Sequence, residues 1–465
     1  MTAETTGNRS PRSIDTLIQN AHVVTFDDSG TILADGAIAI HEGRILEVGP
    51  SHVLSETYAP TRRIFANGQI ALPGLTDAHI HTAQTLMRGL LSTLGRTKAL
   101  RVPTWREYLV PFEASLTPDD VELSGQLAYS SMLATGTTSF FEAGGPHPES
   151  MARAAVETGI RGAVSLNTMD GGARIPESMR MSTEEALQRN IDLVDAWPHD
   201  PDGGTRVSAC MSLRQIITCT PELVTGIHQA AQERGVKVHT HLVEGTYEID
   251  YALENFGRRP VEYLLELGVF DHTLHGAHSV LASIEDVELY AAHGVSAAHC
   301  AKGNYAIGAA PALKMWRKGV AIGLGTDGVA NAGTLDMFRV AMLARVGQQY
   351  IEATPVHNRN GVGLEEPLQM AVTGGAQAMA THGYTGTLAA GKRADIVLVG
   401  TDGPDAAGYS SAEAFLFECA SGRDVRTVLV DGEVVVDDGE MTTVDTEQIR
   451  AKAAVRQQEL AATIA

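Results

Sequence analysis

The sequence predicts an α/β fold, a (β/α)8 TIM-like barrel joined to a small β-sandwich domain built from both chain ends. Two observations predict it. Eight apolar segments typical of strands alternate with helical patterns between residues 72 and 382, as the repeated units of a parallel barrel require. Strand-rich segments at 13–71 and 383–445 flank that region, and each is too small to bury a core alone. We therefore expect the two flanks to share one domain.

The expected elements follow in order along the chain. Residues 1–12 are an expected loose tail, and residues 446–465 an expected C-terminal helix. The expected barrel strands are 68–81, 136–143, 160–167, 206–213, 237–244, 273–280, 295–301 and 321–328. Helical patterns lie between most of them, as at 117–136, 182–197 and 282–294. Ser182 and Ser283 each precede an acidic residue three positions on, which is typical of a capped helix start.

Composition excludes several classes of protein. The formal net charge is −21, so a nucleic-acid backbone or an anionic membrane would repel the chain. We find neither an apolar segment long enough to span a bilayer nor a signal-peptide pattern at the N-terminus. Four scattered cysteines without a C-x-x-C spacing argue against a disulfide framework. We expect a cytoplasmic homo-oligomer that acts on a small molecule.

Polar side chains end four of the expected barrel strands. They are His79 and His81 on the first, His241 on the fifth, His278 on the sixth and Asp327 on the eighth. Residues two apart on a strand face the same side, and the C-terminal strand ends of a barrel meet at one rim. Imidazole nitrogen and carboxylate oxygen are ligands that Zn²⁺ accepts, with a position left for water. These residues therefore predict a metal site at that rim.

The segments around these residues resemble a known family. They are LPGLTDAHIHTAQTLMRG, VHTHLVEGTYE, GAHSVLASIED, GVSAAHCAKGN, VAIGLGTDGVANAGTLDMF and GTLAAGKRADIVLV. Together they are similar to the amidohydrolase superfamily, in its aminohydrolase branch of deaminases and triazine hydrolases. The resemblance implies that His79, His81, His241 and Asp327 bind the metal. It also implies that Glu244 is the proton shuttle and that His278 lies beside the metal-bound water and the substrate.

The chemistry is consistent with those roles. A metal-bound water with a pKa near 7 supplies hydroxide at neutral pH. Glu244, three residues after His241, could carry the water's proton to a ring nitrogen, Asp327 could also receive a proton, and His278 could polarise the water. Two-metal relatives use a carbamylated lysine on the fourth strand, which has no lysine here. We expect one Zn²⁺ per chain, with Fe²⁺ as the alternative, and structural roles for His275 and His299.

The substrate is less well defined by the sequence. Gln84 and Arg214 resemble a Gln and an Arg with which guanine deaminases address the purine. Asn304 and Asn331 are further candidates for substrate binding, in segments that depart from the usual pattern of the family. The deaminases of adenosylhomocysteine and methylthioadenosine carry a histidine near residues 212–214 that this chain lacks.

These observations predict an enzyme. We expect a hydrolase acting on carbon–nitrogen bonds, a deaminase that removes ammonia from a purine, pterin or triazine ring by attack of a metal-bound hydroxide. The alternatives are a nucleoside deaminase of the adenosylhomocysteine and methylthioadenosine type, and a triazine chlorohydrolase or N-alkylaminohydrolase. A metal-free scaffold of the same fold is the non-enzymatic alternative, and the complete set of ligands argues against it.

Overall fold

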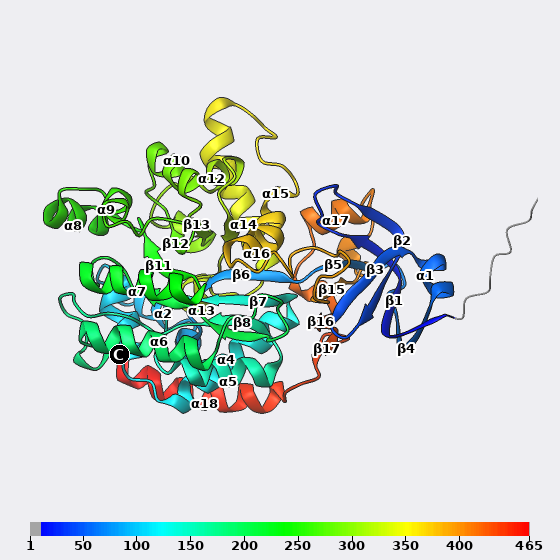
Figure 1. Cartoon of the computed structure of the whole chain (residues 1–465), viewed down its shortest axis with the longest axis horizontal. Coiled ribbons are helices and arrows are strands. Elements are labelled where there is room, and N and C mark those ends of the chain that lie inside the picture. The colour runs from blue at the N-terminus through cyan, green and yellow to red at the C-terminus, as the bar shows by residue number, and fades with distance from the viewer. Residues whose placement is uncertain (1–10, 465) are drawn as a thin grey trace, which may run out of the picture.

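A computed structural model describes residues 11–464 of the chain. Figure 1 shows two regions side by side, with strands from both chain ends at the right and parallel strands surrounded by helices at the left. Most of the predicted tail, residues 1–10, lies outside the described residues, and the first strand already begins at Arg12. The final residue of the predicted C-terminal helix, 465, also lies outside them.

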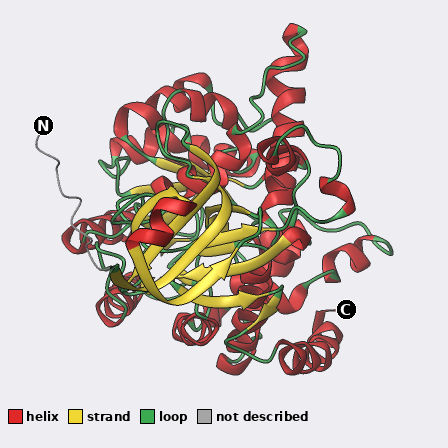
Figure 2. Cartoon of the chain, turned by 90° about the vertical axis from the view of Figure 1, so that its right-hand side faces the viewer, coloured by secondary structure: helices red, strands yellow, loops and turns green. Residues whose placement is uncertain are grey.

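Strands from both chain ends form one mixed sheet of nine strands (Figure 2). They are β1 Arg12–Val24, β2 Ile32–His41, β3 Arg44–Pro50, β4 Tyr58–Phe65, β5 Ile70–Pro73, β15 Ile396–Val399, β16 Val425–Val430, β17 Glu433–Asp437 and β18 Glu440–Met441. The two ends meet where β5 pairs antiparallel with β15, with Leu72 opposite Val397. A shared sheet is therefore observed, whereas its division into a two-sheet sandwich stays a prediction.

The remaining strands are all parallel and form two sheets, β6-β7-β8-β9 and β10-β11-β12-β13-β14. Their bounds are β6 Leu75–Ile80, β7 Thr137–Glu142, β8 Arg161–Val164, β9 Val207–Ala209, β10 Met211–Leu213, β11 Val238–Leu242, β12 Leu274–His278, β13 Ser296–His299 and β14 Ile322–Leu324. Only Cys210 separates β9 from β10, so each of the eight predicted segments contains a strand. The predicted α/β class with parallel strands is confirmed, although the hydrogen-bonded ladders form two sheets and not one closed ring.

Helices follow most of the strands in both regions, and many of them cover the parallel strands (Figure 1). Their bounds are α1 Ser51–Thr57, α2 Leu90–Gly95, α3 Val110–Glu113, α4 Pro118–Ala134, α5 Pro148–Thr158, α6 Thr183–Ala196, α7 Pro221–Arg234, α8 Thr246–Phe256, α9 Pro260–Glu266, α10 Ile284–His293, α11 Ala301–Tyr305, α12 Ala312–Arg317, α13 Gly328–Ala332, α14 Met337–Gln348, α15 Glu366–Gln369, α16 Gly375–Ala378, α17 Ala412–Glu418 and α18 Thr446–Ile464. The two predicted caps are present, because Ser182 accepts a hydrogen bond from the backbone of Glu185, and Ser283 from that of Asp286.

The last strand of the parallel set meets the first at its carboxyl end. The backbone N–H of Asp327, after β14, donates to the carbonyl of His79 in β6 at 2.9 Å. The backbone and hydroxyl of Thr326 donate to Asp77 at 3.0 and 2.6 Å. Asp77 is fully buried, so its carboxylate depends on hydrogen bonds from the protein, and the two from Thr326 hold the strand ends together. The residues after β6 and β14 therefore share one rim.

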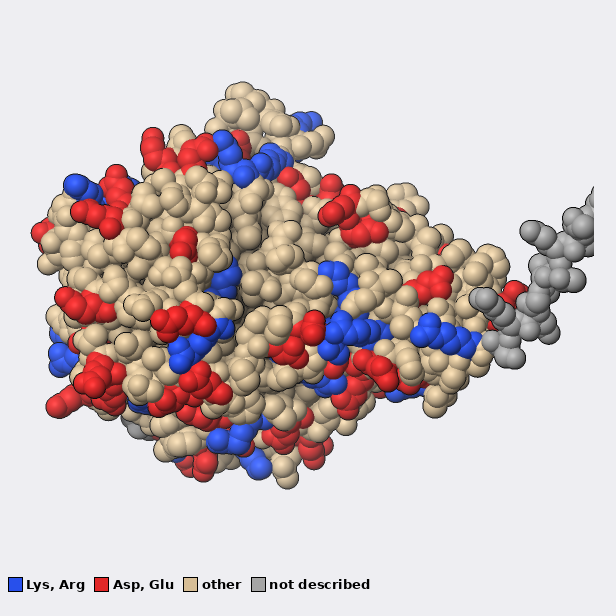
Figure 3. All heavy atoms as spheres, in the orientation of Figure 1, with Lys and Arg blue, Asp and Glu red and all other residues tan. Residues whose placement is uncertain are grey.

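Three features agree with what the composition predicts. On the face in Figure 3, acidic side chains are mixed with Lys and Arg, so the basic residues form no continuous patch on that face. Within residues 11–464, no helix is long and apolar enough to cross a bilayer. All four cysteines are free thiols, as their spacing predicts.

Candidate metal and catalytic site

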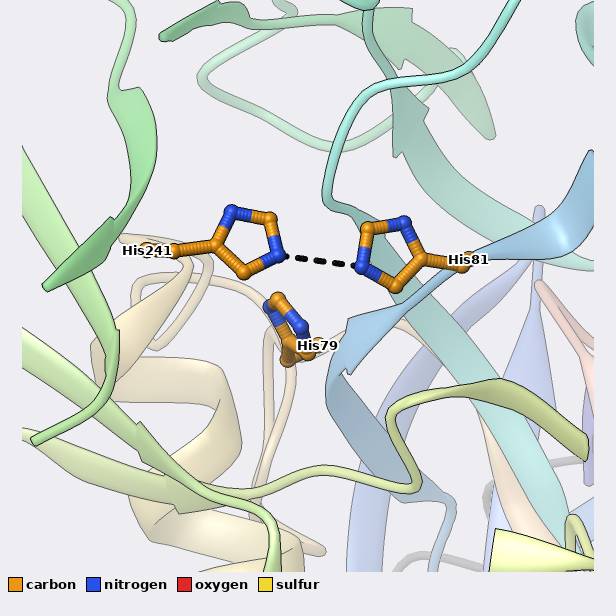
Figure 4. Close-up of side chains that lie close together, drawn as sticks. All are labelled: His79, His81 and His241. Atoms are coloured by element: carbon orange, nitrogen blue, oxygen red, sulfur yellow. Dashed lines mark hydrogen bonds between the residues drawn. The ribbon is translucent and has the colours of Figure 1, made fainter. Parts of the chain in front are cut away.

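Three imidazoles and one carboxylate converge at the rim where the parallel strands end. The Nε2 atoms of His81 and His241 lie 3.0 Å apart, and Figure 4 shows the ring of His79 turned toward both. Oδ1 of Asp327 lies 3.3 Å from Nε2 of His79 and 3.6 Å from Nε2 of His81. Ligand atoms of the three histidines all lie within 4.8 Å of one another, which is close enough to share one ion. The predicted ligands are therefore brought together.

Burial keeps the three imidazoles in the form that binds metal. His79, His81 and His241 are all less than 5% exposed. Burial, and secondly the charge of His278 or Arg214, holds the pKa of His79 and of His81 well below the usual value. Burial and Arg214 do the same to the pKa of His241. A neutral imidazole offers a lone pair, so the site is suited to a cation without first losing protons.

Outer partners orient the ligands toward a common point. Nδ1 of His241 donates to the carbonyl of Arg214 at 2.8 Å, and Nδ1 of His79 lies 2.8 Å from Nε2 of His239. Asn331 donates to Oδ2 of Asp327 at 2.9 Å, which leaves Oδ1 facing the histidines. His79 Nε2 is buried without a hydrogen-bond partner among residues 11–464. Nδ1 of His81 is also buried without a hydrogen-bond partner among the same residues. Three imidazoles and a carboxylate are a donor set that fits a divalent ion such as Zn²⁺.

A cavity of about 230 Å³ opens beside these ligands. Its lining includes His81, His241, His278, Asp327, Glu244, Arg214 and Asn331, together with Trp105, Gln215 and Lys302. Glu244 lies two residues after the end of β11 and is half-buried, while His278 ends β12 and is 3% exposed. The predicted catalytic residues therefore line one cavity, together with His81 and His241 of the predicted metal ligands.

Asn304 lies beneath His278 and not on the cavity wall. Its side-chain oxygen accepts from Nδ1 of His278 at 3.1 Å, and its amide donates to Nδ1 of His299 at 3.0 Å. Nε2 of His299 then meets the hydroxyl of Tyr305 at 3.0 Å. Because Nδ1 of His278 is occupied in this way, its Nε2 remains for the cavity. His299 has the structural surroundings that the sequence predicts, and so does His275, which contacts the carbonyl of Ala78 at 3.1 Å.

Gln84 also lies behind the cavity, in a buried polar network. Its amide donates to Oε1 of Glu113 at 2.6 Å, and Asn167 donates to Oε2 at 2.6 Å. Nη1 of Arg214 lies 3.9 Å from the same carboxylate, so a buried anion faces the buried cation. Arg214 Nη1 has no hydrogen-bond partner within the described chain, and its guanidinium lies 5.7 Å from the ring of Trp105.

Several residues at the site could not be predicted from the sequence. Glu113, Gln215 and Tyr247 carry no spacing signal, because each comes from a loop or a first helical turn. His239 could have been found, since it precedes His241 by two and so faces the same side of β11. Trp105 forms part of the cavity wall, and nothing in the sequence around it indicated a place at the site.

Comparisons with known proteins place the chain in a family. The chain is 32% identical over 447 residues to a 5-methylthioadenosine/S-adenosylhomocysteine deaminase of Nitratidesulfovibrio vulgaris, covering 95% of this chain and 96% of that one. A zinc-bound adenosine deaminase structure from Xanthomonas campestris superposes with a TM-score of 0.88 at 26% identity, covering 98% and 100% of the two chains.

A zinc complex of atrazine chlorohydrolase from Arthrobacter aurescens shares the fold, with a TM-score of 0.85, 24% identity and coverage of 95% and 100%. The sequence model of the amidohydrolase family matches residues 70–435, which is more than half of the chain and includes every residue of the site. The protein therefore belongs to the amidohydrolase family.

Proposed function

We propose that the protein is a metal-dependent hydrolytic deaminase that removes ammonia from an amino-substituted nitrogen heterocycle. One observation carries the proposal. Three buried imidazoles and the carboxylate of Asp327 converge at one point, and two of these imidazoles, Asp327 and Glu244 line the same cavity. Hydrolysis of a C–NH₂ bond needs an activated water and a group that moves its proton, and this set of residues supplies both.

His79, His81, His241 and Asp327 are the residues that would hold the ion, and one ion satisfies them. Zinc fits this donor set, and its presence in the Xanthomonas campestris neighbour supports that choice over Fe²⁺. When bound, the ion lowers the pKa of water so that it loses a proton near neutral pH. The fourth parallel strand, β9 and β10, contains no lysine that could hold a second ion.

Glu244 moves the proton. Its carboxylate lines the cavity, so it can accept the proton from water and deliver it to a ring nitrogen of the substrate. His278, with Nδ1 bonded to Asn304, presents Nε2 to the developing negative charge. Asn304 is thus proposed to position His278, and Asn331 to position Asp327, although both were expected to contact substrate.

The cavity favours a compact, neutral ring. Its volume of about 230 Å³ is below the ~300–1,000 Å³ typical of pockets for drug-sized ligands. Arg214 and Trp105 both line the cavity, so a guanidinium N–H could meet a ring carbonyl or nitrogen and the indole could offer an aromatic face. Glu113 balances the charge of Arg214, so an anionic substrate gains less here than at an isolated arginine. Purine, pterin and triazine bases match these features.

A nucleoside deaminase is the second candidate. The observation that favours it is the 32% identity to a methylthioadenosine and adenosylhomocysteine deaminase over nearly the whole chain. A screen for ammonia release separates the two. Guanine, pterins and aminotriazines form one arm, and adenosine, methylthioadenosine and adenosylhomocysteine the other. Release from nucleosides alone would overturn the preference for a free base, while release of chloride or alkylamine from triazines would identify a triazine hydrolase.

The closure of the barrel and the sandwich form of the second domain are also proposed. We infer that residues 72–382 form one closed (β/α)8 barrel, supported by the bond from Asp327 to His79 that links its last strand to its first. Residues 13–71 and 383–445 would then form the second domain, as a sandwich. A cytoplasmic location and a homo-oligomeric state stay predictions.

Two substitutions test the catalytic assignment. His241→Ala removes one of four ligands, so both bound metal and turnover should be lost. Glu244→Gln keeps the size of the side chain but cannot carry a proton, so metal should stay while kcat falls by about 10²–10⁴. Exposed Glu254→Gln on α8 is the matched control and should keep both. Metal analysis and ammonia release on the three variants decide the matter, and near-native turnover in Glu244→Gln would remove Glu244 from the role of shuttle.

A further inference from the structure

One oxygen of the Glu244 carboxylate is held by two donors, and the other is free. The hydroxyl of Tyr247 donates to Oε2 at 2.5 Å, and the amide of Gln215 donates to the same oxygen at 3.1 Å. No donor from the part of the chain that the structure describes reaches Oε1. Since Glu244 lines the cavity, Oε1 is the atom left to exchange protons with a substrate.

The two donors are themselves held in place. Tyr247 lies in the first turn of α8, and its ring packs 6.4 Å from that of Trp105. In the same turn, buried Glu248 accepts the backbone N–H of Glu244 at 2.9 Å, which ties the start of α8 to the end of β11. Gln215 is 2% exposed and follows β10. Rigid second partners of this kind limit the rotation of a catalytic side chain.

We propose that Tyr247 is a positioning residue for the deamination. Its hydroxyl, together with the amide of Gln215, fixes the Glu244 carboxylate so that only Oε1 faces the reacting atoms. This inference rests on the proposed function, in which Glu244 is the shuttle. The carboxylate must first accept a proton and then release it to one face of the substrate ring. A single fixed orientation favours a high rate, since small misplacements of reacting groups lower the rate strongly.

The competing explanation is that Tyr247 only fills space between α8 and Trp105. Tyr247→Phe separates the two, because the ring stays and the hydroxyl is lost. Tyr251→Phe on the same helix is the matched control, since no donor or acceptor of the described residues contacts its hydroxyl, and its kcat should be unchanged. For Tyr247→Phe we expect kcat to fall about 10- to 100-fold, the range for losing a hydrogen bond to a charged group, with KM, metal content and melting temperature unchanged.

A double-mutant cycle shows whether Tyr247 acts through Glu244. In the Glu244→Gln background, Tyr247→Phe should cause almost no further loss of kcat, because the group it positions no longer carries a proton. Unchanged kcat in the single variant, or an equal fold loss in both backgrounds, would overturn the positioning role. If Glu244→Gln itself keeps its turnover, the shuttle assignment fails and the positioning role fails with it. If Glu244→Gln is impaired and Tyr247→Phe is not, only the positioning role fails.

Discussion

Replacement of Glu113 by glutamine tests whether this carboxylate neutralises Arg214 inside the protein. Glu113 and Arg214 are 1% and 3% exposed, and Nη1 of Arg214 lies 3.9 Å from Oε1. At an effective dielectric constant of ~20, their attraction at this distance is about 4 kcal/mol. Glu113→Gln removes that attraction and leaves a guanidinium buried without a counter-charge. We expect the free energy of unfolding to fall by roughly 3–5 kcal/mol, the range for breaking a buried pair from one side.

The reverse substitution should be milder. Arg214→Met leaves Glu113, and burial raises the pKa of that carboxyl, so it can take up a proton and become neutral. The double variant Glu113→Gln/Arg214→Met should also be more stable than Glu113→Gln alone, because no unpaired charge remains. Equilibrium urea unfolding of the metal-loaded enzyme, followed by tryptophan fluorescence, measures all three, and Trp105 beside Arg214 reports on this region.

A surface pair supplies the control. Arg153 lies 2.8 Å from Glu122, closer than the buried pair, but the two side chains are 53% and 32% exposed. Glu122→Gln should therefore cost less than about 1 kcal/mol. If Glu113→Gln is no more destabilising than Glu122→Gln, Glu113 does not compensate Arg214, and the argument for a neutral substrate loses its support.

Two further predictions concern the same region. Arg214→Met should lower kcat/KM on the true substrate by about 30- to 1,000-fold while metal content stays full, and unchanged steady-state kinetics would exclude contact between Arg214 and the substrate. Burial raises the pKa of Glu142 to about 8, above its ordinary 4.5, so the folded protein keeps a proton that the unfolded chain releases. As the pH rises between these two values, the free energy of unfolding should therefore fall by up to about 1.4 kcal/mol per pH unit. Urea titrations at several pH values measure this slope, and Glu142→Gln should reduce it. Equal slopes for the two proteins would show that Glu142 is already ionised in the folded protein.

The convergence of the four proposed metal ligands could be predicted from sequence because strand ends have a local signature. His79, His81, His241 and Asp327 each follow a short apolar segment, and parallel strands deliver their carboxyl ends to one rim. The eight strand segments were also found, because buried strands and capped helices are patterns of neighbouring residues. What these signals could not give was the pairing between sheets, which depends on contacts such as that of Asp77 with Thr326, 249 residues apart in sequence.

The contacts of the site's polar residues could not be predicted from the sequence either, because they also depend on residues far apart in the chain. Gln84 and Asn304 have the chemistry of substrate-binding residues, and the sequence shows which groups they carry but not where those groups point. The structure directs Gln84 to Glu113 and Asn304 to His278, at separations of 29 and 26 residues. Glu113 itself was missed, since a glutamate in a short helix has no pattern that distinguishes burial from exposure.

In the proposed mechanism, Arg214 would link metal binding to substrate binding, because its backbone and its side chain make different contacts. Its backbone carbonyl accepts from Nδ1 of His241 and so fixes the tautomer that leaves Nε2 for the ion. Its side chain lines the cavity beside Trp105 and faces Glu113. A change of side chain at this position therefore leaves the carbonyl in place, and selection could alter the substrate without loss of the ion. The position after the fourth parallel strand is thus suited to changes of specificity within a fixed hydrolytic site.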